Sequence, residues 1–329
     1  MKYLLVDSLN MFFRAKHVGG RGADIDTKIG MAMHIMFNSL AKCHREFDAD
    51  HIVLCLEGRS WRKDFYEPYK KNRKVTQNQR SPREVEDDEL YFEAYDDMCK
   101  FFAEKTNCSV IRCERAEADD MIAVWIQDHP EDEHMIVSTD SDFYQLMAPN
   151  VQQYNGTLDQ LVSLEGFVDA KTGKRVIDKK TKAEKALPDP EYILFEKCVR
   201  GDSADNVFSA YPGARTKGSK NKTGILEAYE DRNTSGYNYN NFMLQRWVDH
   251  NGDEQRVRDC FERNKILIDL TLQPDDIKAL VKERIAEQTQ TEQMRNVGIH
   301  FMKFCAKHNL MRMSENPNNY TAMLNGPAR

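Results

Sequence analysis

Residues 117–142 read EADDMIAVWIQDHPEDEHMIVSTDSD, and they carry the clearest indication of the fold class. Acidic residues open it, Ala118–Asp128 has the pattern of a helix, and Met135–Val137 is a short apolar run of the kind that forms a buried strand. More acids follow directly after that strand. A helix followed by a strand that ends in polar residues is typical of an α/β domain.

The same alternation continues on both sides of this stretch. We predict further strands at Tyr3–Val6, Ile52–Leu56, Ser109–Arg112 and Val151–Tyr154, and further helices in the region Ile29–Phe47, at Leu90–Lys105 and starting at Phe143–Met147. This order favours an α/β layered domain with a largely parallel sheet, in which functional residues gather beyond the carboxyl ends of the strands. After about Pro188 the strand signals fade and helical segments dominate, so we expect a domain boundary near Leu187–Asp189.

The composition is that of an ordinary globular protein. The 329 residues are 40% hydrophobic and 30% charged, with a formal net charge of −6. No apolar run approaches the ~20 residues of a membrane span, and Asp7 interrupts the first apolar run, which argues against a signal peptide. We therefore expect a cytoplasmic or nucleoid protein. The eight cysteines form no CxxC pair, and we interpret them as reduced, mostly buried thiols.

Seven acids follow predicted strands or open the next helix: Asp7, Glu57, Glu117, Asp119, Asp120, Asp140 and Asp142. Each alone could simply cap a helix. Together in one crevice they would repel one another and would need protonation or cations. Oxygen ligands suit Mg²⁺ and Mn²⁺. Two such ions about 4 Å apart assist phosphodiester hydrolysis, which needs no serine, cysteine or histidine nucleophile.

Two basic stretches complement these acids. Residues 59–83 hold nine Lys or Arg against two acids, interleaved with aromatic residues, and residues 214–222 hold four cations and no acid. Basic residues neutralise phosphates, and aromatic rings stack on unpaired bases. A solvated basic face is the alternative, but the position directly after Glu57 favours substrate binding. The candidate nucleic-acid-binding residues are Arg62, Lys63, Tyr66, Lys71, Lys74, Arg215, Lys217, Lys220 and Lys222.

Several motifs, in this order, resemble the 5′-nuclease superfamily of flap endonucleases and 5′→3′ exonucleases, and within it the RNase H enzymes of T-even phages. The motifs are LLVDSLNMFFRA (4–15), WRKDFYEPYKKNR (61–73), EADDMIA (117–123), STDSDFYQL (138–146) and RGDSADN (200–206). The resemblance implies a PIN-like nuclease core at 1–188 with a mixed sheet and a helical arch at about 58–90. It also implies a helical C-terminal domain at 189–329, with a DNA-binding helix–three-turn–helix at about 190–230.

The resemblance also implies roles for single residues. Asp7, Glu57, Asp119 and Asp140 would form a first metal site, and Glu117, Asp120, Asp142, Asp202 and Asp205 would complete it and form a second. The cofactor would be Mg²⁺, as two ions, with Mn²⁺ as a substitute. Tyr69, Lys70 and Arg73 would grip the 5′ strand near the scissile phosphate, as catalytic residues of the arch.

The implied activity is removal of RNA primers, 5′ ends and flaps from duplexes during DNA replication, leaving 5′-phosphates. The implied partners are DNA and RNA–DNA duplexes, a sliding clamp and a single-strand DNA-binding protein, and the expected state is a monomer. The sequence leaves the preference among these substrates open.

Two features depart from the family pattern. Glu57 stands where the family usually has Asp, and the basic loop 211–224 replaces a compact Gly-x-Gly turn that often builds a monovalent-ion site.

Three other interpretations compete with a 5′ nuclease. A PIN-type ribonuclease would lack the arch and RGDSADN. A phosphatase with a phospho-aspartate would need an acid where Leu9 stands. A non-catalytic binding module would have lost some of the acids, whereas the set here is complete.

Overall fold

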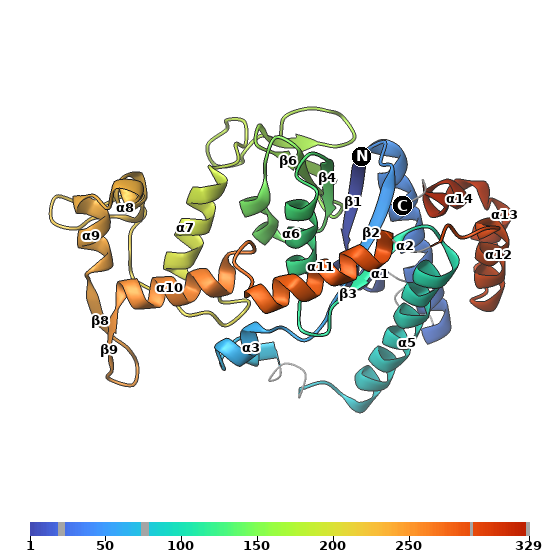
Figure 1. Cartoon of the computed structure of the whole chain (residues 1–329), viewed down its shortest axis with the longest axis horizontal. Coiled ribbons are helices and arrows are strands. Elements are labelled where there is room, and N and C mark those ends of the chain that lie inside the picture. Colours follow the sequence, from blue (N-terminus) through green and yellow to red (C-terminus); the bar gives the residue numbers. More distant parts are fainter. Residues whose placement is uncertain (19–23, 74–78, 290–291, 327–329) are drawn as a thin grey trace. The chain divides into compact units, whose positions relative to one another are not determined.

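A computed structural model describes residues 1–18, 24–73, 79–289 and 292–326 (Figure 1). The chain forms two compact units, which are described separately. Unit 1 comprises residues 1–60, 80–187 and 274–329, and unit 2 comprises residues 61–79 and 188–273.

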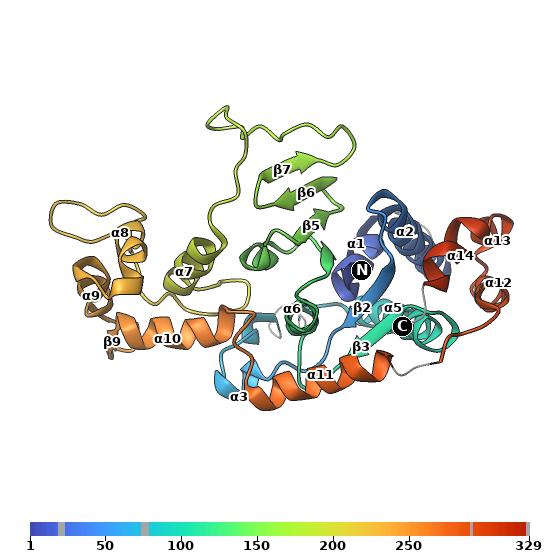
Figure 2. The same ribbon diagram turned by 45° about the horizontal axis from the view of Figure 1, so that its top comes forward.

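Unit 1 is built on a seven-stranded sheet of order β3-β2-β1-β4-β5-β6-β7. The strands are β1 (Lys2–Asp7), β2 (His51–Leu56), β3 (Ser109–Arg112), β4 (Glu133–Val137), β5 (Val151–Asn155), β6 (Gln160–Ser163) and β7 (Gly166–Asp169). The first five are parallel. At one edge β6 pairs antiparallel with β5, and β7 pairs antiparallel with β6 (Figure 2). The predicted α/β class and the mixed, largely parallel sheet are confirmed.

The central strands explain why the sheet forms. β1 (KYLLVD) and β2 (HIVLCL) are apolar over most of their length, and their central residues are buried. Such continuous apolar runs suit parallel strands that are covered on both faces. The helices of unit 1 are α1 (Ser8–Val18), α2 (Ile25–Glu46), α5 (Pro82–Lys105), α6 (Ala118–Asp128), α11 (Asp275–Thr289), α12 (Val297–Lys307), α13 (Met311–Glu315) and α14 (Asn318–Asn325).

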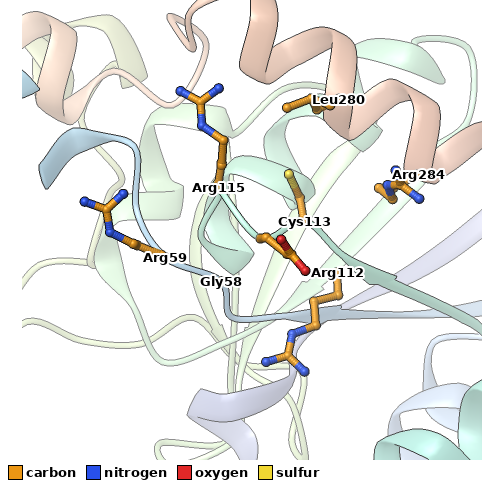
Figure 3. Close-up of a pocket in the computed structure, with 8 residues that line it drawn as sticks. Gly58, Arg59, Arg112, Cys113, Arg115, Leu280 and Arg284 are labelled. Carbon is orange, nitrogen blue, oxygen red and sulfur yellow. The ribbon is translucent and has the colours of Figure 1, made fainter. Parts of the chain in front are cut away.

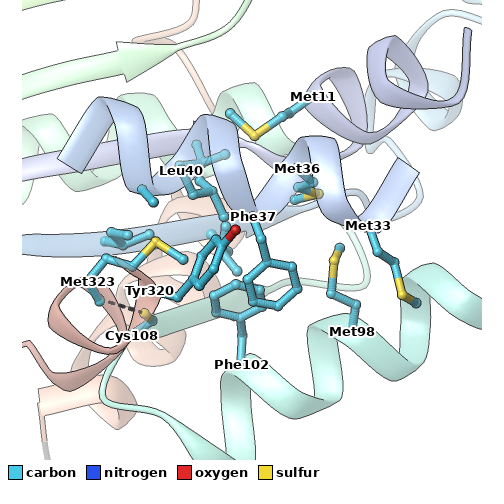
Figure 4. Packing of buried hydrophobic residues seen from close by; sticks show 14 of the residues in the cluster. Met11, Met33, Met36, Phe37, Leu40, Met98, Phe102, Cys108, Tyr320 and Met323 are labelled. Carbon is cyan, nitrogen blue, oxygen red and sulfur yellow. Dashed lines mark hydrogen bonds between the residues drawn. The ribbon is translucent and has the colours of Figure 1, made fainter. Parts of the chain in front are cut away.

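The main core of unit 1 joins helices from opposite ends of the chain (Figure 4). The rings of Phe37 on α2 and Phe102 on α5 stack with centroids 5.2 Å apart, and Phe301 and Tyr320 from the C-terminal helices contact Phe37 as well. The predicted division at 188/189 follows chain order. The compact units do not, because residues 274–329 pack into the core of unit 1.

Unit 2 is mainly helical. It contains α3 (Arg62–Phe65), α7 (Pro190–Arg200), α8 (Ile225–Glu230), a short 3-10 helix (Arg232–Thr234), α9 (Tyr237–Met243), the hairpin β8–β9 (Arg246–Val248 and Glu254–Arg256) and α10 (Val257–Ile268). Buried Asn264 on α10 donates to the carbonyl oxygens of Cys198 (2.9 Å) and Phe208 (2.8 Å), so it ties α10 to α7 and to the loop that follows α7. Helix α7, this loop and α8 occupy the predicted helix–three-turn–helix region.

Some local details differ from the sequence-based prediction. The element at Phe143 is a 3-10 helix, η1 (Ser141–Leu146), and not the start of an α-helix. Within the predicted arch, Ser81 and Glu84 form a capping box that begins α5. All eight cysteines are buried thiols that form no disulfide. In the part of the chain that the structure describes, every helix is too short or too polar to span a bilayer.

Candidate functional site

Asp7 ends β1 and is held at the carboxyl edge of the sheet. Its carboxylate accepts hydrogen bonds from the Ser138 hydroxyl (2.9 Å) and from the backbone N–H of Asn10 (3.3 Å). The same Ser138 oxygen accepts a bond from the Asp140 N–H (3.1 Å), and Gln153 on β5 donates to the carbonyl oxygens of Ser138 (2.9 Å) and Asp140 (2.7 Å). One hydrogen-bond network therefore fixes the ends of β1 and β4 relative to each other.

The N-terminus of α6 gathers three acids. Carboxylate oxygens of Glu117, Asp119 and Asp120 all lie within 4.8 Å of one another, and Glu117 and Asp120 are buried. Asp120 accepts the Glu117 N–H (3.1 Å), while Ser60 donates to Glu117 (2.8 Å). The first N–H of α6 donates to Glu57 (3.0 Å), so the loop after β2 is bonded to this cluster.

Asp140 and Asp142 belong to the turn that follows β4. Asp140 caps η1 by accepting the Asp142 N–H at 2.9 Å. All seven acids predicted from strand ends thus lie in the loops at the carboxyl edge of the sheet or in the helical turns that begin there. Closely spaced oxygen donors, partly withdrawn from water, fit a hard divalent cation such as Mg²⁺ or Mn²⁺.

Asp202 and Asp205 lie in unit 2. Burial alone would raise the pKa of Asp202, but the hydrogen bond and the charge of Lys197, 2.9 Å away, outweigh burial and lower it. Backbone N–H groups of Ala204 and Asp205 also donate to the Asp202 carboxylate. This carboxylate is therefore ionised and oriented within its own loop, and its role as a metal ligand stays a prediction.

Asp205 is the point on which the three predicted arch residues converge. Its carboxylate accepts the Tyr69 hydroxyl (3.0 Å) and pairs with Arg73 (2.7 Å) and with the Lys70 ammonium group (3.6 Å). The Lys70 N–H also donates to the Asp205 carbonyl (2.8 Å), and Lys70 has a left-handed φ of 54°. Unit 2 thus places a predicted ligand in contact with the residues predicted to grip phosphate.

The structure corrects one predicted nucleic-acid contact. Arg62 is only 1% exposed, its Nε donates to the Leu267 carbonyl (2.8 Å), and its guanidinium lies 4.7 Å from the Trp61 ring. A phosphate cannot reach a cation that is buried in this way, so Arg62 has a structural role. The carbonyl acceptor of Arg62 is more than 200 residues away in sequence, and the local basic pattern cannot reveal it.

The other candidates around the arch have different surroundings. Lys63 and Lys71 are exposed, and Lys71 pairs with Glu67 (2.5 Å). Tyr66 is half-buried, with Arg263 over its ring. Lys74 lies outside the described residues.

The basic loop between α7 and α8 is exposed and well anchored. Its cations Arg215, Lys217, Lys220 and Lys222 are all exposed. Glu227 on α8 accepts hydrogen bonds from the N–H groups of Gly218 (3.0 Å) and Gly224 (2.9 Å). A Cβ on Gly224 would lie 2.3 Å from the Gly218 nitrogen, so the two glycines permit this close turn.

Sequence reasoning missed the residues that orient the acids. Two serines donate to the carboxylates, Ser60 to Glu117 and Ser138 to Asp7, and Gln153 donates to the backbone carbonyl of Asp140. A search for charged residues does not find them, because all three side chains are neutral. Ser138 had a usable signal, because it comes directly after β4, at the same edge as the acids. Gln153 had none, since its partners come from another strand end.

Comparison with profiles of protein families assigns this chain to a family. The profile of the 5′–3′ exonuclease N-terminal resolvase-like domain matches residues 2–184, which is more than half of the chain. The chain belongs to this 5′–3′ exonuclease family. The matched region contains the seven acids predicted from strand ends and the arch residues Tyr69, Lys70 and Arg73.

Named relatives within the 5′–3′ exonuclease family agree with this assignment. Ribonuclease H of Enterobacteria phage T4 is 28% identical over 269 residues, which cover 76% of this chain and 75% of the phage protein. DNA polymerase I of Rhizobium leguminosarum is 28% identical over 185 residues, or 56% of this chain. That match spans only 15% of the length of the polymerase.

Solved structures show the same fold. The bacteriophage T5 flap endonuclease, in a complex with DNA and metal ions, matches with a TM-score of 0.57 at 18% identity. The match covers 88% of this chain and 100% of the phage chain. The fold of this chain therefore resembles that of the T5 flap endonuclease.

Proposed function

We propose that this protein is a divalent-metal-dependent 5′ nuclease that hydrolyses phosphodiesters at 5′ ends, flaps and RNA primers. The observation that carries the proposal is the cluster of Glu117, Asp119 and Asp120, whose oxygens lie within 4.8 Å of one another in a chain of the 5′–3′ exonuclease family. The geometry supports the same reaction class as the sequence, because a close set of carboxylates suits a divalent cation and leaves no role for a serine or cysteine nucleophile.

Mg²⁺ is the proposed cofactor, held as two ions, and its chemistry would be activation of water and stabilisation of charge at the scissile phosphate. The residues of the chain position the ligands. Ser60 orients Glu117, Ser138 orients Asp7, and the N–H groups at the start of α6 orient Glu57 and Asp120. Ligands that are held before the cation arrives need little reorganisation when it binds.

Unit 2 supplies the proposed strand contacts. Lys70 and Arg73 each pair with Asp205, and a phosphate of the 5′ strand would compete with that carboxylate for them. The exposed cations of the loop between α7 and α8 would hold the duplex backbone through phosphates, independently of base sequence. By family resemblance the setting is primer removal by a monomer, with a sliding clamp and a single-strand DNA-binding protein as partners.

The test is cleavage of a 5′-labelled flap duplex and of an RNA-primed DNA duplex, each with Mg²⁺ and with EDTA. We expect short 5′-phosphorylated fragments only with Mg²⁺. Asp119→Asn should lower kcat by about 100-fold or more, a loss typical of removing one preorganised electrostatic contact, and should leave duplex binding in EDTA nearly unchanged. Glu131→Gln, at an exposed acid outside the cluster, is the matched control.

Two results would refute the proposal. Equal cleavage in EDTA would exclude the metal requirement. Tight binding of both substrates without any cleavage in Mg²⁺ or Mn²⁺ would identify a binding protein with the fold of a nuclease.

A further inference from the structure

A pocket with a basic lining lies on unit 1 (Figure 3). It is a cavity of about 750 Å³ whose charged lining is four arginines and one acid. The lining residues come from the loop after β2, the loop after β3 and helix α11: Gly58, Arg59, Arg112, Cys113, Glu114, Arg115, Leu280 and Arg284.

The loops that line the cavity also carry two of the acids. Glu57 directly precedes Gly58, and Glu117 follows the loop after β3. A Cβ on Gly58 would lie 2.0 Å from the Cys113 carbonyl oxygen, and the Arg59 N–H donates to the Glu114 carbonyl (2.9 Å). The two loops are therefore packed backbone to backbone, and the position of the arginines is tied to the position of the acids.

The cavity also lies along the same sheet edge as the acids. Arg112 ends β3 and is level with Leu56, the residue before Glu57 on the neighbouring strand β2. The order β3-β2-β1-β4 therefore places Arg112, Glu57, Asp7 and the Asp140 turn in sequence along the carboxyl edge. A strand that follows this edge beyond the acids reaches the arginines.

Three of the arginines, Arg112, Arg115 and Arg284, remain available to an anionic ligand. Arg115 pairs with Asp276 (2.9 Å), and Arg284 pairs with Glu287 (2.6 Å), but the side chains of all four partners are 40% exposed or more. Exposed pairs of this kind contribute little free energy, so a phosphate can replace the carboxylate. Arg112 is exposed and has no ion pair within the described residues.

We propose that this cavity binds a single-stranded segment of the nucleic-acid substrate through its phosphates. The inference rests on the proposed nuclease function and adds a second contact to it. A guanidinium group can hold a phosphate by two parallel hydrogen bonds, and Leu280 and Cys113 give the cavity an apolar wall for a sugar or base. Its volume lies in the range of sites for small molecules, about 300–1,000 Å³, which suits a few nucleotides of one strand.

The first measurement is binding of a fluorescent short oligothymidylate in EDTA, so that no cleavage is needed. The double variant Arg112→Ala/Arg284→Ala removes two proposed phosphate contacts and should weaken binding. The magnitude of the slope of log K against log salt concentration should fall by about 1.4, because each contact to a single strand contributes roughly 0.7. The corresponding double change to Lys should retain most of the slope. Arg312→Ala, at an exposed arginine on α13, is the matched control.

The second measurement locates the strand. Photocrosslinking with a 4-thiothymidine oligomer, followed by peptide mapping, should label residues 112–115 or 280–284. An unchanged salt slope in the double Ala variant, or crosslinks confined to residues 188–273, would overturn the proposal. If thymidine monophosphate displaces the labelled oligomer as well as unlabelled oligothymidylate does, the site binds a mononucleotide instead. If polyglutamate displaces it equally well, the site binds an acidic peptide. Failure of nuclease activity with crosslinking retained would count only against the proposed function.

Discussion

Lys70 and Lys71 are neighbours in sequence with opposite surroundings. The Lys70 side chain is 11% exposed, lies beside Asp205 and over the Tyr69 ring, and starts from a left-handed backbone. The Lys71 side chain is 60% exposed and pairs with Glu67, four residues earlier in the chain. A side chain that is already confined loses less entropy when it binds phosphate than a mobile one does.

This difference predicts different losses of activity. Lys70→Ala should lower kcat/KM on a flap substrate by about 100-fold, because a positioned cation is lost from the side of the scissile phosphate. Lys71→Ala should change it by less than about threefold, as expected of an exposed ion pair. Steady-state kinetics on the same labelled flap will decide. Equal losses in the two variants would contradict the arch assignment of Lys70.

At the scale of elements, hydrophobic periodicity was sufficient to place five of the strands and the carboxyl edge of the sheet. Apolar runs such as IVLCL form buried strands, so their length and spacing indicate where the strands of the sheet lie in the sequence. The acids at that edge followed from the same pattern. The orientation of Glu57 and Glu117 did not, because it depends on Ser60 and on N–H groups that only the folded loops bring together.

Unit 2 was less predictable than unit 1. Arg62 lies in a basic stretch, and local charge alone made it a candidate for binding phosphate. Its burial depends on Leu267, more than 200 residues later in the chain. The contact of Asp205 with Tyr69 and Arg73 is equally remote in sequence. Pairings of this kind have no local signal.

The loop after β2 has a strict requirement for glycine. A Cβ at Gly58 would meet the carbonyl oxygens of Cys113 (2.0 Å) and Ala116 (2.6 Å), both of which are backbone atoms. We expect Gly58→Ala to cost about 1–3 kcal/mol, in line with other overpacked sites, and to lower kcat as it pushes Glu57 away from the start of α6. Thermal unfolding together with flap cleavage measures both effects.

Gly30→Ala provides the control for the loop variant. Gly30 lies inside α2, and an added Cβ would make only an ordinary contact with Leu310, at 3.9 Å. Alanine in a helix interior should stabilise the protein by about 0.5–1 kcal/mol. A Gly58→Ala protein as stable and active as Gly30→Ala would show that the two loops are not rigidly joined.

At the scale of the whole molecule, an ion-pair cluster fastens α12 to α5 within unit 1. Asp97 on α5 lies 2.7 Å from Lys307 and 2.5 Å from His308. Burial would raise the pKa of Asp97, but the hydrogen bonds from Lys307 and His308 outweigh burial and lower it. Because the pKa is lower in the folded state, the stabilisation is present above the unfolded value of 3.8 and is lost as the pH falls through the folded value.

The stability of unit 1 should therefore decline below about pH 4, partly through Asp97. Urea unfolding between pH 6 and pH 3 should give a smaller decline for Asp97→Asn than for the unaltered protein. The difference at pH 6 should be modest, about 0.5–1 kcal/mol, since the partners are partly exposed. Parallel curves for the two proteins would mean that the contact does not contribute to folding.

The return of the chain to unit 1 at residue 274 has a consequence for synthesis on the ribosome. The strands of the sheet and helices α2 and α5 emerge early, but Phe301 and Tyr320, which contact Phe37, emerge after them. Until then the nascent chain exposes an aromatic surface that chaperones would recognise. The core of unit 1 can therefore close only after residues 274–329 have emerged, so the making of the sheet and the packing of its last helices are separated in time.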